Sequence, residues 1–252
     1  MKRVLVLVLA MTGILAAGCI VRFGTFNKDT DHYVGLASNI SGVDVVSASV
    51  QVDFLDISGN IVDTENVDTC TRTLQKGMDS PIEATSDRDA RSVRATLHPL
   101  TFGHRDGTDI DDIDEDDVEI PAVSGDTLHI KGTDLIVANE DLEDVQICAA
   151  IFDNDGNVLA VGDDDVGDID DGDSASFDVE IGISDFADED LDVGDIDSYE
   201  LWIDARADGD ITAPSVVGPN EVDAEEATPT PTGTPPTATP TRTPTPTITP
   251  TP

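Results

Sequence analysis

Apolar and polar residues alternate with a period of two in two separate parts of the chain. Between residues 47 and 54 the alternation places Ala48, Val50, Val52 and Phe54 on one face. Between residues 145 and 151 it does the same for Val145, Ile147, Ala149 and Ile151. Successive side chains of a β-strand point to opposite sides, so this pattern predicts strands with one face in a core.

Each of these strands runs into a turn rich in Asp, Asn and Gly. The turns are residues 56–60 (Asp-Ile-Ser-Gly-Asn) and 153–157 (Asp-Asn-Asp-Gly-Asn), and the two stretches align without a gap. Gly59 and Gly156 supply the positive φ that a tight hairpin needs. In both halves a second glycine turn follows, at Gly77 and Gly172, and then a last strand, at residues 92–97 and 198–203. We therefore interpret the chain as two related β-rich halves.

The same alignment predicts where two unusual side chains lie. Cys148 aligns with Gln51, off the core face, which leaves it available at a surface or a domain junction. Trp202 is the only tryptophan and stands between Leu201 and Ile203, so we expect it to close the core of the second half.

The strand that precedes each first turn ends in a motif that resembles the FxLYD domain of bacterial and archaeal envelope proteins. The motif is Val-Asp-Phe-Leu-Asp at residues 52–56 and Ala-Ala-Ile-Phe-Asp at residues 149–153, with only the final Asp kept in both copies. The resemblance covers about residues 32–100 and 129–206. It implies two tandem small immunoglobulin-like β-sandwiches in an all-β protein, and it provides no catalytic residues to carry over.

The two ends of the chain differ from the body. Residues 1–18 combine Lys2 and Arg3 with an apolar run, which is the pattern of a secretory signal. Residues 15–19 (Leu-Ala-Ala-Gly-Cys) resemble the bacterial lipobox, which implies cleavage before Cys19 and lipidation of its thiol. The alternative is an ordinary secreted protein. Residues 228–252 are almost entirely Thr and Pro, so a helix or central strand is not expected there.

These observations predict six segments, which are a lipoprotein signal peptide (1–18), a tether (19–28), a first sandwich (29–105), an acidic linker (106–126), a second sandwich (127–213) and a disordered acidic, then Thr/Pro-rich tail (214–252). The expected location is extracytoplasmic, at the cell envelope, with a lipid anchor in the membrane.

Charge narrows the choice of partners. The chain has 53 acidic and 13 basic residues, which gives a net charge of −40. Such a field repels the phosphates of nucleic acid and anionic lipid surfaces, and it favours cations. Calcium is the one cofactor that the sequence suggests, because clustered carboxylates are its usual ligands. The candidate ligands are Asp163, Asp165, Asp168, Asp170, Asp171 and Asp173. The competing interpretation is a solvated acidic surface adapted to salt.

Cysteine and catalytic motifs add little chemistry. Cys70 and Cys148 lie in different halves, so a disulfide between them would join two domains; two separate thiols are the alternative. The chain contains no Gly-x-Ser-x-Gly, His-Glu-x-x-His or phosphate-binding glycine loop. The sequence therefore favours a non-catalytic envelope module that binds a protein or polysaccharide. A calcium-dependent adhesion module is the second hypothesis, and a secreted enzyme of unrecognised type is the third.

Overall fold

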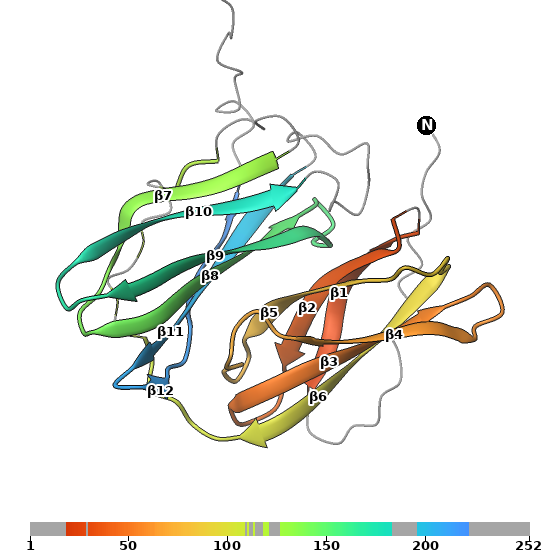
Figure 1. The fold of residues 1–252 in the computed structure, drawn as a ribbon, viewed down its shortest axis with the longest axis horizontal. Coiled ribbons are helices and arrows are strands. Elements are labelled where there is room, and N and C mark those ends of the chain that lie inside the picture. Colours follow the sequence, from red (N-terminus) through yellow and green to blue (C-terminus); the bar gives the residue numbers. More distant parts are fainter. Residues whose placement is uncertain are drawn as a thin grey trace, which may run out of the picture.

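The computed structural model describes residues 19–28, 30–108, 110, 113, 118–120, 127–182 and 196–221. The named elements within these residues are thirteen β-strands, which confirms the prediction of an all-β protein. They form two β-sandwiches that lie side by side (Figure 1).

The first sandwich packs a sheet in the order β1-β2-β5 against a sheet in the order β4-β3-β6. Its strands are β1 (Cys19–Asn27), β2 (His32–Asn39), β3 (Val45–Leu55), β4 (Ile61–Asp68), β5 (Asp79–Thr85) and β6 (Ser92–Phe102). The four alternating residues of β3 are buried between the two sheets, where Leu74 and Ile82 also lie. The period-two pattern therefore identified the core face of β3 correctly.

The second sandwich packs a two-stranded sheet, β10-β7, against a larger sheet in the order β12-β11-β8-β9, with β13 also paired to β11. Its strands are β7 (Thr127–Val137), β8 (Leu142–Phe152), β9 (Val158–Ile169), β10 (Ser174–Gly182), β11 (Ser198–Ala207), β12 (Asp210–Ile211) and β13 (Ser215–Glu221). Val145, Ile147, Ala149 and Ile151 of β8 all lie in the core between these sheets.

The two sandwiches share one arrangement of five strands. Strands β2 to β6 of the first correspond to β7 to β11 of the second, because β4-β3-β6 and β9-β8-β11 have the same order and β2 pairs β5 as β7 pairs β10. The second turns also match, since the amide of Gly77 donates to Asn39 O and the amide of Gly172 donates to Ala138 O, both at 2.8 Å. The two related halves predicted from the sequence are present.

The two hairpin turns have the same hydrogen bonds. In the first, the Asp56 carboxylate accepts hydrogen bonds from the amides of Ser58 and Asn60, at 2.7 and 2.9 Å. In the second, the Asp153 carboxylate accepts from the amides of Asp155 and Asn157, at 2.9 and 2.8 Å. Gly59 and Gly156 have φ of +78° and +77°, as the turn chemistry predicts.

Two predicted boundaries are wrong. The residues expected to form a tether are strand β1, which pairs with β2 along its length, from Cys19 opposite Asn39 to Asn27 opposite His32. The predicted tail begins with strand β13, which pairs with β11 from Ser215 to Glu221. In the five-strand arrangement, one edge of β2 and one edge of β11 have no neighbouring strand, and β1 and β13 pair with these edges. Backbone hydrogen bonding to an open edge forms these strands although their sequences alternate only weakly.

The described part of the predicted linker belongs to the second sandwich. Gly107 forms a parallel bridge with Ala213, and Glu119 an antiparallel bridge with Lys131. Ile113 is buried in the second core, and the other three apolar residues of the segment, Ile110, Val118 and Ile120, pack against it. These four side chains add to the core of the second sandwich, so the prediction that this segment is a separate linker is wrong for its described residues.

Candidate functional site

The candidate site lies at the junction where the first sandwich meets the second. The β1-β2-β5 sheet packs on the β9-β8-β11 sheet through a third apolar cluster. Its members are Val34, Leu36 and Met78 from the first sandwich and Cys148, Ala150, Phe152, Val158 and Trp202 from the second. Each sheet is therefore covered on both faces around this cluster, and every residue of β2 is buried.

Trp202 lies in this junction, not in the second core as predicted. It is fully buried, and its neighbours Leu201 and Ile203 point into the second core from the other side of β11. Successive side chains of β11 point to opposite faces, and both faces of the strand are covered. An apolar run in the sequence therefore does not indicate on which face Trp202 is buried.

Cys70 and Cys148 form a disulfide across the junction, with their Cα atoms 6.3 Å apart. Cys148 is on the face of β8 opposite the second core, at the domain junction that the alignment suggested as one of its two places. Of the two alternatives for the cysteine pair, the structure contains the bridge. It links residues 78 positions apart in the sequence and holds the two sandwiches together beside the apolar cluster.

A buried charge lies next to the disulfide. Asp204 on β11 is fully buried, and its Oδ2 accepts a hydrogen bond of 2.7 Å from the backbone amide of Arg72. The Arg72 Nε is 3.8 Å from the same oxygen. Burial raises the pKa of the Asp204 carboxyl, and the hydrogen bond and charge of Arg72 oppose this effect only in part.

A half-buried acid faces an ion pair of the other sandwich. Arg22 Nη2 lies 2.5 Å from Asp79 Oδ2; Arg22 pairs with Leu36 of β2, and Asp79 pairs with Ser38 of β2. Glu200 of β11 approaches this pair. Burial and the neighbouring Asp79 charge raise the pKa of Glu200 to about 7, while Arg22 acts in the opposite direction. Glu200 therefore changes its charge near neutral pH within the junction.

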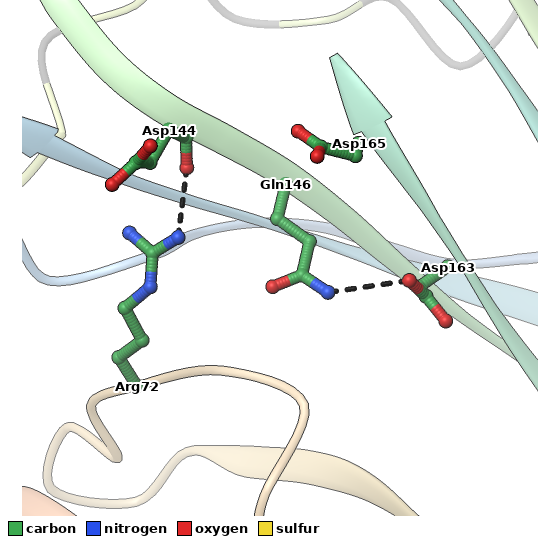
Figure 2. A pocket seen from close by; sticks show the side chains of 5 residues that line it. All are labelled: Arg72, Asp144, Gln146, Asp163 and Asp165. Carbon is green, nitrogen blue, oxygen red and sulfur yellow. Dashed lines mark hydrogen bonds between the residues drawn. The ribbon is translucent and has the colours of Figure 1, made fainter. Parts of the chain in front are cut away.

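Next to the junction is an open cleft of about 240 Å³. It is lined by Arg72, Asp144, Gln146, Asp163 and Asp165. Figure 2 shows Arg72 rising from the first sandwich toward β8, where its Nη2 donates a hydrogen bond of 2.9 Å to the carbonyl oxygen of Asp144. Gln146 Nε2 donates to Asp163 Oδ2 at 3.3 Å on the far side of the cleft.

The cleft gathers two of the six predicted calcium ligands, Asp163 and Asp165 of β9. Asp168 instead accepts a hydrogen bond of 3.0 Å from the amide of Asp144. The turn between β9 and β10 contains Asp170, Asp171 and Asp173, where the amide of Asp171 donates to Asp141 Oδ1 at 2.9 Å. The six aspartates are therefore divided between the cleft, the end of β9 and a turn.

Another set of metal-ligand types was missed by the sequence analysis. Within the described residues, the group whose ligand atoms all lie within 4.8 Å of one another is His129, Asp178 and Glu180. His129 Nδ1 is 2.8 Å from Asp178 Oδ1, and Lys131 Nζ is 2.6 Å from Asp178 Oδ2. These residues come together through pairing of β7 with β10, which no local spacing reveals. Both Asp178 oxygens already have cationic or imidazole partners, so the group is an ion-pair network.

Cys19, the predicted lipidation site, is the first residue of β1. It is half-buried and packs against the first core, and its Sγ lies 3.6 Å from Asn39 Oδ1. The described residues include no helix long and apolar enough to cross a membrane. The signal peptide and the Thr/Pro tail that were predicted lie outside the described residues.

Comparison with known proteins leaves the family open. No family model matches the chain, and no curated protein matches it. Among solved structures, a glycosyl hydrolase family 2 member from Bacteroides cellulosilyticus is similar at 10% identity and a TM-score of 0.28, over 74% of this chain and 28% of that one. An FMN-binding beta-glucuronidase from Facaelibacterium prausnitzii L2-6 is similar at 12% identity and a TM-score of 0.24, over 73% of this chain and 31% of that one.

A biofilm-associated protein BSP domain is also similar, at 13% identity and a TM-score of 0.17, over 78% of this chain and 29% of that one. The chain spans a third or less of the length of these three structures. At such low TM-scores these similarities indicate nothing about the activity of this chain.

Proposed function

We propose that this protein is a non-catalytic, lipid-anchored module of the cell envelope that binds an envelope protein or polysaccharide. The observation that carries the proposal is the junction. A disulfide, an apolar cluster and the Arg72–Asp204 contact join the two sandwiches into one body, and the first strand of that body starts at Cys19. A stiff body attached at its first residue can hold a binding surface at a fixed place relative to the membrane.

The outer face of the β4-β3-β6 sheet is the surface that suits binding best. Its side chains are polar, and they include Ser49, Gln51, Thr64, Asn66 and Thr96. Asp53 is buried beneath Arg94, with hydrogen bonds from Gln51 Nε2 at 2.8 Å and Thr64 Oγ1 at 3.0 Å. A sheet face with hydroxyl and amide groups can hydrogen-bond to a polysaccharide or to a polar protein surface.

The anchor is tested by fractionating cells that make the full chain or its Cys19→Ala variant. We expect the wild-type protein in the membrane fraction and the variant in the soluble fraction. The matched control is Cys70→Ala with Cys148→Ala, which removes the two disulfide-bonded cysteines and should leave the protein with the membrane. Retention of Cys19→Ala in the membrane would show that the anchor is wrong.

The binding face is tested by placing a photo-crosslinking amino acid at Thr96, which lies on β6 beside Gln51 of the central strand, and separately at Ser58, in the exposed hairpin turn. We expect a defined adduct with an envelope component from position 96 and none from position 58. Equal adducts from both positions, or none from position 96, would refute this face as the binding surface.

The calcium-binding alternative has one observation in its favour, the presence of Asp144, Asp163 and Asp165 around one cleft. The guanidinium of Arg72 lines the same cleft, which disfavours a cation there. Replacing Arg72 by Gln should increase calcium affinity if these carboxylates bind the ion, and isothermal titration calorimetry measures that change.

A further inference from the structure

One end of the first sandwich exposes apolar side chains around Cys19. Ile20, Ile40, Val43 and Phe102 are 42%, 54%, 54% and 47% exposed. Exposed apolar residues that stand singly need no explanation, whereas a group of them marks a surface that meets something apolar.

Strand pairing places these residues together. Cys19 pairs with Asn39, Ile20 pairs with Ser38, and Ile40 directly follows Asn39. On the other sheet of the sandwich Val45 pairs with Phe102, and the amide of Gly103 donates to Asp44 O at 3.0 Å. We call this end the tip and define it as residues 19–20, 40–44, 75–78 and 102–105. In Figure 1 it is the end at which the β6 arrow finishes and β3 begins.

Hydrogen bonds from the Asn39 side chain fix the backbone of the loop formed by residues 40–44. Asn39 Nδ2 donates to Val43 O at 2.9 Å and to Leu74 O at 2.8 Å, and Asn39 Oδ1 accepts from the amide of Ser41 at 3.0 Å. Because its backbone is fixed in this way, the loop presents Ile40 and Val43 outward, and they do not fold onto the core.

The charge of the tip differs from that of the chain. Lys76, His104 and Arg105 lie in it together with one acid, Asp44, and Asp79 and Asp106 directly follow two of its segments. The Asp44 carboxylate is already engaged, since it accepts a hydrogen bond of 2.8 Å from the amide of Lys76 and lies 2.9 Å from His104 Nδ1. In a protein with a net charge of −40, the tip is therefore a place where an anionic surface can approach.

We propose that the tip lies in the headgroup layer of the membrane leaflet that holds the lipid of Cys19, with Ile40, Val43 and Phe102 inserted at the boundary with the acyl chains. This inference rests on the proposed lipid anchor. It goes beyond that anchor because it fixes which surface of the body touches the membrane. Cys19 is itself paired in the sheet, so no spacer separates an attached lipid from Ile40, and the leaflet is the one apolar phase that must lie within reach of the tip.

Depth-dependent fluorescence quenching tests the inference on the full, lipidated chain in vesicles that contain anionic lipids with brominated acyl chains. Trp202 is fully buried at the junction and serves as an internal standard that bromine should not quench. The test variant is Val43→Trp. The matched control is Ile57→Trp, since Ile57 is also apolar and 90% exposed but lies in the hairpin turn at the other end of β3.

We expect brominated lipid to remove about half or more of the emission from the indole at position 43, as for a side chain about 5–10 Å into the boundary of headgroups and acyl chains. Emission from position 57 and from Trp202 should not change. Flotation of the same vesicles separates the two proposals. Wild-type protein that fails to float refutes the lipid anchor and the tip together. Protein that floats without quenching at position 43, or with equal quenching at position 57, refutes the tip alone.

A second copy of the chain is the competing occupant of the tip. Analytical ultracentrifugation of the lipid-free Cys19→Ala protein distinguishes it, because the membrane proposal expects a monomer with Val43 in water. A dimer that Val43→Asp dissociates would overturn the proposal.

Discussion

Removing the disulfide between Cys70 and Cys148 should lower the stability of the whole body. The perturbation is the pair of substitutions Cys70→Ala and Cys148→Ala. Alanine fits the junction because Cys148 lies fully buried among Ala150, Phe152 and Trp202, where a serine hydroxyl would need a partner. The double variant therefore removes the bridge without adding a buried polar group.

The size of the effect follows from the loop that the bridge closes. The two cysteines are 78 positions apart. In the loop-entropy account a bridge contributes about 3 kcal/mol for a loop of about 15 residues and about 4.7 kcal/mol for about 100, which puts this one near 4.5 kcal/mol. For a body of about 200 residues each kcal/mol shifts the melting temperature by about 2–4 °C, so the variant should melt about 9–18 °C lower.

Differential scanning calorimetry of residues 19–221 measures this shift, with Cys19→Ala as the control that removes a thiol and leaves the bridge intact. A reducing agent should lower the melting temperature of the control and leave that of the double variant unchanged. A double variant that melts within about 2 °C of the control would refute the reasoning, because the bridge would then constrain the unfolded chain much less than its loop length implies.

Three further predictions concern the junction, the hairpins and the net charge. The pKa of Glu200 is about 7 in the folded protein, above its ordinary value of 4.5. Between these two pH values the folded protein keeps a proton that the unfolded chain has lost, so the stability of the fold decreases as the pH rises. Glu200→Gln should remove that fall and make the protein about 1–2 kcal/mol more stable at pH 8, after allowance for solvent screening of this partly exposed group, as urea unfolding measures. Asp153→Ala and Asp56→Ala should each lower the melting temperature slightly and by similar amounts, because each removes the carboxylate that accepts hydrogen bonds from two turn amides while water can still reach these turns. A loss of stability in one hairpin alone would contradict the equivalence of the two turns. Sodium chloride should raise the melting temperature by screening the net charge of −40, and a larger rise with calcium at matched ionic strength would favour the calcium alternative.

The hairpins could be predicted from the sequence because their signals are local. Alternation along β3 identified its core face, and the Asp and Gly of each turn act within five residues of one another. The junction was harder to predict from the sequence, although the sequence of β8 contains a signal for it. Cys148, Ala150 and Phe152 are as apolar as the residues between them, which is typical of a strand covered on both faces.

The remaining features depend on partners that are distant in the sequence. Strand β1 shows little alternation and is defined by its pairing with β2, and His129 meets Asp178 across two strands 49 positions apart. Asp204 could not be distinguished from the other 52 acidic residues before Arg72 was seen beside it. Spacing along the chain contains no information about such encounters.

The way in which the sandwiches stack has a consequence for assembly. The β1-β2-β5 sheet of the first sandwich packs on the β9-β8-β11 sheet of the second, and these are unlike faces of the shared fold. A further sandwich that packed in the same manner on the free β4-β3-β6 face would extend the stack into a filament. The register aligns Gln51 of that free face with Cys148, and Thr96 with Trp202. The polar outer face of the first sandwich therefore ends the stack, as the polar outer faces of terminal repeats do in solenoid proteins. A few polar side chains on this face are enough to oppose the packing of a further sandwich.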